Sequence, residues 1–339
     1  MVDARAGILK GKKEAARLHR QFGMRERIQQ DGGRIDVFDT IVKCGVPLLF
    51  KPLDGLLGVF IDAPIPGVMV TTRRGLSVQR FTGAHELGHC RLGHSPSLDD
   101  DSMLRRSPFV AAPDDKQQEF EANAFATEFM LPPWLFAAQF QRQGWTPAMM
   151  ADPMVVYQLS LRIGASYEAT CRSLMRPGVE VIGRRTLDDL LKVQPRAIKK
   201  GLLGDYDPPD FVRDVWLLTA KDENAAIEGC RSDLFVLKLT EHSGSGYVWT
   251  FDELNKAGFA VVRDEREGPD GEAVGGHVTR SITTLSEGQQ HGRLALAERR
   301  PWIADGAPLG AFCVHYDLSG PEDEGMSHAE RRLLFLEAA

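Results

Sequence analysis

The period of the hydrophobic pattern changes once along this chain, and this change limits the fold more than any other feature. In the first 176 residues the apolar positions recur mostly at helical spacing, interrupted by two short β-branched runs, LLGVFI and GVMVTT. From about residue 211 the apolar residues come in short alternating runs such as LFVLKLT, with glycine, serine and aspartate between them. We therefore predict an α+β chain in which a mostly helical part with a small sheet precedes an antiparallel β-sandwich.

The same pattern divides the chain into five segments. The first is a mostly helical domain, with helices expected over about residues 8–30 and 78–92, and the second is a further group of helices. The third is a helical linker, the fourth is the sandwich, and the fifth is one loosely attached helix at the C-terminus. In order, the segments are residues 1–135, 136–176, 177–210, 211–320 and 321–339.

Charge and cysteine content exclude several classes of protein. The formal net charge of −6 argues against a general nucleic-acid-binding surface, which needs an excess of basic residues. The five cysteines are scattered and form no CxxC pair, so neither a disulfide framework nor a cysteine-zinc site is predicted. No signal peptide and no run of about 18 apolar residues occurs. We expect a soluble cytoplasmic protein that does not contact a membrane.

Three histidines lie in the stretch FTGAHELGHCRLGH, residues 81–94. His85 and His89 share one face of the predicted helix because they are four residues apart, and Glu86 lies at the edge of that face. Two imidazoles and a neighbouring carboxylate are the groups that the H-E-x-x-H motif uses to hold zinc and to take a proton from water. The alternative is a surface helix whose two histidines bind no metal.

A third metal ligand is expected from another helix, in DDKQQEFEANAFATEFML. Glu119 has the polar residue Asn123 four positions later, so one group can bind the metal while the other orients a histidine ring. Glu121 has Phe125 at that spacing and points about 200° around the helix from Glu119. We therefore predict Glu119 as the ligand, Asn123 as its supporting group, and Glu121 as a solvated residue.

Other side chains are candidates for contacts with the substrate or the transition state. His94 is one residue too early for the pattern H-E-x-x-H-x-x-G-x-x-H, so it either acts near the site or caps the helix. Tyr157, Tyr167 and Arg80 are further candidates for stabilising an oxyanion, and the sequence does not rank them.

Three blocks together resemble the ImmA/IrrE family of zinc metallopeptidases over about residues 12–176. They are QRFTGAHELGH, EFEANAFATEFMLPP and VYQLSLRIGASYEATCRSL, in this order along the chain. The resemblance implies a zincin-like, gluzincin-type domain in which His85, His89 and Glu119 hold Zn²⁺, which Mn²⁺ can replace, and Glu86 is the general base. It also implies the substrate class, because family members of known function cleave transcriptional repressors, often of the helix-turn-helix type, and relieve repression after stress.

The third block resembles a helix-turn-helix segment, but direct DNA binding is not expected. Its second helix carries only Glu168 and Arg172 as charged groups, which is too little positive charge for phosphate contacts.

The C-terminal part resembles chagasin-like cysteine-protease inhibitors, which are immunoglobulin-like sandwiches, over about residues 211–320. The resemblance lies in HSGSGYVWTF, VGGHVTR and ERRPWI, which correspond to the three inhibitory loops. The first loop departs from the family pattern, since His242 and Ser243 stand where the family has Asn-Pro. The matching positions are Gly246, Tyr247, Trp249, Gly275, Gly276, Arg300, Pro301 and Trp302.

Two functions are compatible with these features. The leading hypothesis is a zinc endopeptidase that cleaves a protein substrate, with the sandwich as a recognition or regulatory module for a second protein partner. The alternative is a protease inhibitor or sensor that acts through the sandwich. Trp249 and Trp302 are either part of a protein-binding surface or simply core and rim aromatics of the sandwich.

Overall fold

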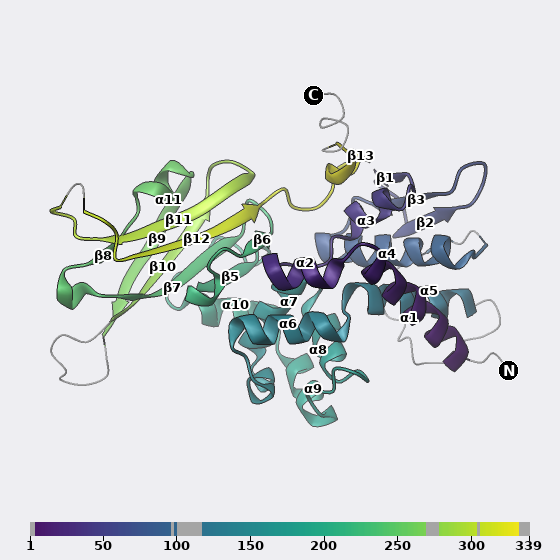
Figure 1. Cartoon of the computed structure of the whole chain (residues 1–339), viewed down its shortest axis with the longest axis horizontal. Helices are drawn as coiled ribbons and strands as arrows, with labels where there is room; N and C mark the ends of the chain where they lie inside the picture. The colour runs from purple at the N-terminus through teal and green to yellow at the C-terminus, as the bar shows by residue number, and fades with distance from the viewer. Residues whose placement is uncertain (1–3, 96–97, 100–116, 269–277, 304–305, 332–339) are drawn as a thin grey trace.

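The computed structural model describes residues 4–95, 98–99, 117–268, 278–303 and 306–331. A sheet with its helices lies at one end of the molecule and a β-sandwich at the other, with further helices between them (Figure 1). The predicted α+β class is therefore confirmed. In the described part of the chain no helix is both long and apolar enough to cross a membrane.

The N-terminal part consists of one mixed sheet and the helices packed on it. The strand order in the sheet is β13-β1-β3-β2-β4, where β13 is Gly325–Met326 near the C-terminus, and β1 and β3 are parallel. Helix α4 packs under β2 and β3, and α5 packs against both α4 and α1. The elements are α1 (Ala4–Gln21), α2 (Met24–Asp31), α3 (Val37–Lys43), β1 (Leu48–Lys51), β2 (Gly58–Ile61), β3 (Gly67–Thr71), α4 (Leu76–Leu92), β4 (Leu98–Asp99) and α5 (Gln117–Met130).

The single helix predicted over residues 8–30 is wrong, since two helices, α1 and α2, cover this segment. Gly23 lies between them with a φ of 54° in the left-handed region, a conformation that glycine adopts without steric cost. The chain therefore turns at Gly23, and α2 leaves α1 in a new direction (Figure 1).

Helix α1 approaches α5 closely because Gly7 and Gly11 face it. A Cβ at Gly11 would lie 2.4 Å from the Glu121 carbonyl oxygen and 2.8 Å from the Phe125 nitrogen. A Cβ at Gly7 would lie 3.2 Å from Cγ of Glu121. Two glycines four residues apart thus let the backbones of the two helices touch, and α1 covers the face of α5 that carries Glu121.

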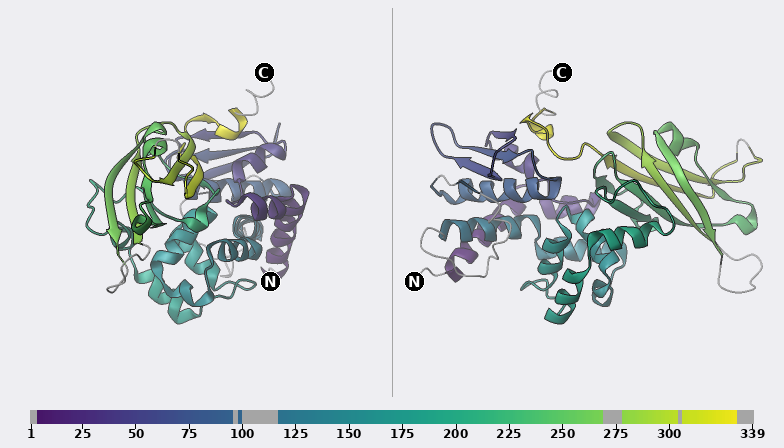
Figure 2. Two further views of the ribbon diagram at one scale, coloured as in Figure 1. Left: turned by 60° about the vertical axis from the view of Figure 1, so that its left-hand side comes forward. Right: turned by 180° about the vertical axis from the view of Figure 1, so that it is seen from behind.

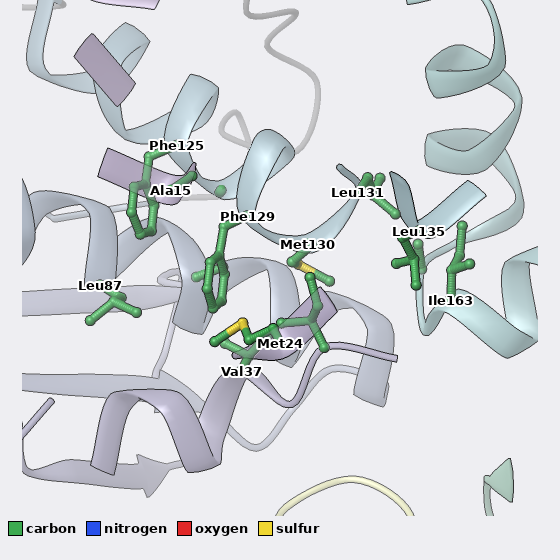
Figure 3. Close-up of a cluster of buried hydrophobic side chains, with 14 of the residues drawn as sticks. Ala15, Met24, Val37, Leu87, Phe125, Phe129, Met130, Leu131, Leu135 and Ile163 are labelled. Carbon is green, nitrogen blue, oxygen red and sulfur yellow. The ribbon is translucent and has the colours of Figure 1, made fainter. Parts of the chain in front are cut away.

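One hydrophobic core runs from α1 through the helices that follow α5. Phe125 and Phe129 stack with ring centroids 5.5 Å apart and belong to the same hydrophobic cluster as Leu87 of α4 (Figure 3). The same cluster continues through Leu135 and Ile163. The helices beyond α5 therefore share their core with the N-terminal sheet and its helices. They are α6 (Pro133–Gln143), η2 (Pro147–Ala151), α7 (Pro153–Ile163), α8 (Tyr167–Leu174), α9 (Arg184–Lys192) and α10 (Pro195–Leu203).

The C-terminal part is a sandwich of two four-stranded sheets, with orders β5-β7-β10-β9 and β6-β12-β11-β8. Most neighbours are antiparallel, as predicted, but β5 pairs parallel with β7 and β6 pairs parallel with β12. The elements are β5 (Val215–Thr219), η3 (Ala220–Asp222), β6 (Ala226–Glu228), β7 (Leu234–Glu241), η4 (Ser243–Ser245), β8 (Val248–Thr250), α11 (Asp252–Lys256), β9 (Phe259–Glu267), β10 (Val278–Ser286), β11 (His291–Arg299) and β12 (Gly310–Asp317).

The tail after the sandwich differs from the predicted helix over residues 321–339. It returns to the N-terminal sheet, where β13 (Gly325–Met326) pairs antiparallel with β1 (Figure 2). Gln79 of α4 donates to the backbone oxygen of Glu322 at 3.1 Å, and Ala329 is buried in the main core. Helical residues begin only at 328, because the preceding segment completes the sheet. The described part of the tail is therefore firmly attached.

Candidate metal centre

Helix α4 carries the first three candidate residues into the interior. It ends where predicted, at Gly93, whose φ of 67° is the left-handed conformation that commonly closes a helix. His85, Glu86 and His89 have no exposed surface, because α4 is covered by the sheet on one side and by α5 on another. Gly88 permits the contact with α5, since a Cβ there would lie 3.2 Å from Cα of Ala122.

His85, His89 and Glu119 converge on one point between α4 and α5. Nε2 of His85 is 3.5 Å from Oε2 of Glu119, Nε2 of His89 is 3.4 Å from Oε1, and the two Nε2 atoms are 2.9 Å apart. Zinc bonds of about 2.0–2.2 Å in a tetrahedron give ligand separations of about 3.3–3.6 Å. The two distances from the histidines to Glu119 lie in this range, and the distance between the two Nε2 atoms is somewhat shorter. These residues therefore fit a tetrahedral metal ion. The structure thus brings together the predicted ligand set.

Glu86 lies against strand β2 at the position of Gly58. A Cβ at Gly58 would be 2.5 Å from Oε1 of Glu86 and 2.5 Å from Cγ2 of Thr82. Only glycine leaves room for the carboxylate at this point of the strand. The general-base candidate is therefore enclosed between its own helix and the sheet.

Asn123 is buried beside the site, one helical turn after Glu119. Its Oδ1 has no hydrogen-bond partner among the described residues. The supporting contact expected from Asn123 to a histidine ring remains a prediction.

His94 supplies a contact to His89 that the sequence left open. Its Nδ1 is 3.1 Å from Nδ1 of His89, and its Nε2 is 3.1 Å from Oε2 of Glu121. Glu121 in turn accepts from Nζ of Lys10 at 2.6 Å and from Nε2 of Gln117 at 3.0 Å. Burial lowers the pKa of His94 despite the opposing effect of the Glu121 carboxylate, so the ring is neutral near pH 7.

The prediction that Glu121 is solvated is wrong, since only 3% of the residue is exposed. The prediction assumed that the side of α5 away from Glu119 faces water, whereas α1 covers it. Burial alone would raise the pKa of Glu121, but the hydrogen bonds from Lys10, His94 and Gln117 outweigh burial and the pKa is lowered. Glu121 is thus a buried carboxylate in contact with His94, which in turn contacts His89.

The other candidates for oxyanion contacts make their hydrogen bonds elsewhere. The Tyr157 hydroxyl donates to Asp214 at 2.8 Å, at the junction of α7 with the sandwich. The Tyr167 hydroxyl donates to the Leu190 carbonyl at 3.2 Å. Arg80 donates to Glu228 of β6 at 2.7 Å. These three side chains therefore make structural contacts, to the start of the sandwich, to α9 and to β6.

The sandwich loops place some of their candidates in the core and others at the surface. Trp249 is 7% exposed and packs inside the sandwich, whereas Trp302 is 70% exposed. Arg300 lies over the ring of Tyr247, 4.5 Å from its centroid. A Cβ at Gly246 would lie 2.5 Å from the Trp302 ring. Pro301 is exposed beside Trp302, and Gly275 and Gly276 lie outside the described residues.

The first of these loops departs from the inhibitor pattern and is held internally. The backbone nitrogen of His242 donates to Oε1 of Glu298 at 2.6 Å, and Nδ1 of the same histidine lies 3.0 Å from that oxygen. Glu298 is 2% exposed, so the start of the loop is fixed to the body of the sandwich.

A known family model matches the part of the chain that contains the candidate metal site. Residues 44–175 match the family model Peptidase M78, described as the IrrE N-terminal-like domain. This range contains α4, α5 and the three residues of the candidate metal site, and it confirms the predicted metallopeptidase family for this part. The comparison with curated proteins finds no match.

Two solved structures resemble part of the chain. The cysteine protease inhibitor EhICP2 from Entamoeba histolytica is 22% identical with a TM-score of 0.27, covering 32% of this chain and 97% of that chain. Amebosin, solved in solution, is 20% identical with a TM-score of 0.25, covering 31% of this chain and 96% of that chain. The expected resemblance to cysteine-protease inhibitors is found again, and TM-scores of this size carry no further conclusion.

Proposed function

We propose that this chain, whose residues 44–175 match the IrrE N-terminal-like domain of the Peptidase M78 family, is a zinc-dependent endopeptidase that cleaves a protein substrate. The observation that carries this proposal is the convergence of His85, His89 and Glu119 on one point, with Glu86 adjacent in sequence. Two neutral imidazoles and one carboxylate are a ligand set of catalytic zinc sites, which leave one coordination position for water or substrate.

The residues of α4 and α5 have two roles in the proposed reaction, metal binding and proton transfer. His85, His89 and Glu119 hold the metal, which when bound polarises the scissile carbonyl and lowers the pKa of water. Glu86 takes the proton from the attacking water and later returns it to the leaving amine. The enclosure of Glu86 between α4 and β2 limits the rotamers that its side chain can adopt.

Metal binding can be tested by stability measurements on the full chain. At a free zinc concentration of 100 times the dissociation constant, the free energy of unfolding should exceed that of the metal-free protein by about 2.7 kcal/mol. His85→Ala should lose this stabilisation because it removes a ligand. His315→Ala is the matched control, since this histidine is exposed on β12 and should leave the zinc effect intact. Equal stability of the wild-type protein with and without zinc would contradict the proposal.

The proposed substrate is a helix-turn-helix repressor, as the resemblance to the ImmA/IrrE family implies. Direct DNA contact by the chain's own α7–α8 pair is not part of the proposal. The two charged groups of α8 neutralise each other, because Arg172 pairs with Glu168 at 2.7 Å on the exposed side of the helix. A repressor whose gene lies next to the gene of this protein is the candidate substrate. When it is incubated with this protein and Zn²⁺ or Mn²⁺, it should be cut once into two fragments.

We further propose that the sandwich recognises the protein substrate or a second protein partner through the exposed Trp302. Tryptophan is one of the residues that most often contribute a large part of the binding free energy of a protein interface. Trp302→Ala should raise KM for the protein substrate about tenfold and leave cleavage of a short peptide unchanged. Val212→Ala is the control, since Val212 is 89% exposed but lies outside the loops. Equal KM values for wild-type protein and Trp302→Ala would exclude this role.

A further inference from the structure

Four side chains from three separate segments form a continuous chain of hydrogen bonds that ends on a metal ligand. Lys10 of α1 contacts Glu121 of α5 at 2.6 Å, Glu121 contacts His94 at 3.1 Å, and His94 contacts His89 at 3.1 Å. Glu121 and His94 each have only 4% of the side chain exposed. The chain is therefore largely shielded from water, with Lys10 as its outer end.

The position of His89 fixes the direction of each hydrogen bond. Nε2 of His89 faces His85 and Glu119, so it is the nitrogen that binds metal, and the proton of the neutral ring is on Nδ1. Nδ1 of His89 then donates to Nδ1 of His94. The remaining proton of His94 is on Nε2, which donates to Glu121. Glu121 accepts hydrogen bonds from both His94 and Lys10. Each group in the chain therefore has a fixed role as donor or acceptor toward its neighbour.

We propose that His94, Glu121 and Lys10 are positioning residues of the metal centre, which hold the ring plane and tautomer of His89 and thereby set the metal affinity. This inference rests on the metal site of the proposed function. A ligating histidine usually has its second ring nitrogen bound to a carboxylate or a carbonyl. Here a second histidine is inserted between the ligand and the carboxylate, and the lysine at the end of the chain holds the carboxylate in its charged form.

Helix α1 is part of the metal centre on this view, although it precedes residues 44–175. Gly7 and Gly11 bring it close enough for Lys10 to reach Glu121 and for the helix to exclude water from that carboxylate. A second ion pair joins the same two helices without touching the site, since Lys12 lies 3.6 Å from Glu128. Lys10–Glu121 and Lys12–Glu128 both join α1 to α5, but only the first is linked to His89. Comparing the two pairs therefore separates an effect on metal affinity from an effect on helix packing.

The test compares Glu121→Gln and Lys10→Met with Glu128→Gln and Lys12→Met in the full chain. Competition with a chelator gives the zinc dissociation constant, and the visible absorption of the Co²⁺-substituted protein reports the ligand field. Glu121→Gln should weaken zinc binding about tenfold and shift the Co²⁺ spectrum. Lys10→Met should weaken binding about threefold, and the two control variants should match the wild-type protein in both measurements.

The outcomes separate this inference from the proposed function. Absence of metal binding by the wild-type protein would overturn both. Normal binding by the wild-type protein together with an unchanged dissociation constant and Co²⁺ spectrum for Glu121→Gln would overturn the inference alone. If Glu121→Gln does not fold, Lys10→Met decides, because 52% of the Lys10 side chain is exposed and its replacement leaves the core intact.

Discussion

Glu86→Gln is expected to reduce kcat about 1,000-fold while the bound zinc remains, because the amide cannot accept the proton that the carboxylate takes from water. Glutamine has nearly the same volume as glutamate, so the variant still fits against Gly58 without enlarging the tight contact with β2. The loss should fall on kcat rather than on KM, since Glu86 is proposed to act on the attacking water and not on substrate binding.

Metal content and secondary structure distinguish this effect from a general loss of folding. The variant should retain zinc at the wild-type ratio, because His85, His89 and Glu119 are unchanged. Glu168→Gln is the matched control, since Glu168 lies exposed on α8 in an ion pair with Arg172 and should leave kcat unchanged. Cleavage by Glu86→Gln at the wild-type rate would show that another group is the general base.

The parts of the site that could be predicted from sequence depend on local spacing. His85 and His89 share a face through helix geometry alone, and Gly93 closes the helix through its own φ preference. Glu119 was identified because the helix that carries it has clear apolar periodicity and a polar residue one turn later. The Peptidase M78 match covers these positions, as the ImmA/IrrE resemblance implied.

The parts that could not be predicted depend on which element packs on which. Glu121 is buried only because α1 covers it, and the signal for that contact was the pair Gly7 and Gly11 within a charged helix. Strand β10 shows no clear alternation in the sequence for a related reason, since the polar residues Arg280 and Thr284 are buried in it along with Ile282. Arg280 is acceptable there because Glu241 and Asp264, each at 2.6 Å, neutralise it. Polar residues buried by partners distant in sequence break the alternation that marks a strand.

A cluster of charged groups joins the sandwich to the helix of the metal site. Glu228 of β6 accepts from Arg80 of α4 at 2.7 Å and also pairs with Arg34. Arg80 also donates to the carbonyl of Gly164, in the turn between α7 and α8, at 3.4 Å. The side chain of Arg80 is 5% exposed and that of Arg34 is 10% exposed. The Glu228 carboxylate of the sandwich thus contacts two guanidinium groups of the N-terminal part, those of Arg80 and Arg34.

Glu228→Gln should therefore lower the free energy of unfolding by about 2–3 kcal/mol, because it leaves two buried cations facing a neutral amide. The value lies below that for a fully buried pair, since 33% of the Glu228 side chain is exposed. Arg80 lies on α4 five residues before His85, so the substitution should also lower activity by loosening that helix. Glu265→Gln, which breaks the exposed pair with Arg263 in β9, should change stability by less than about 0.5 kcal/mol. Chemical denaturation gives the free energy of unfolding of both variants and of the wild-type protein. Equal values for Glu228→Gln and the wild-type protein would show that the contact between the sandwich and α4 does not stabilise the fold.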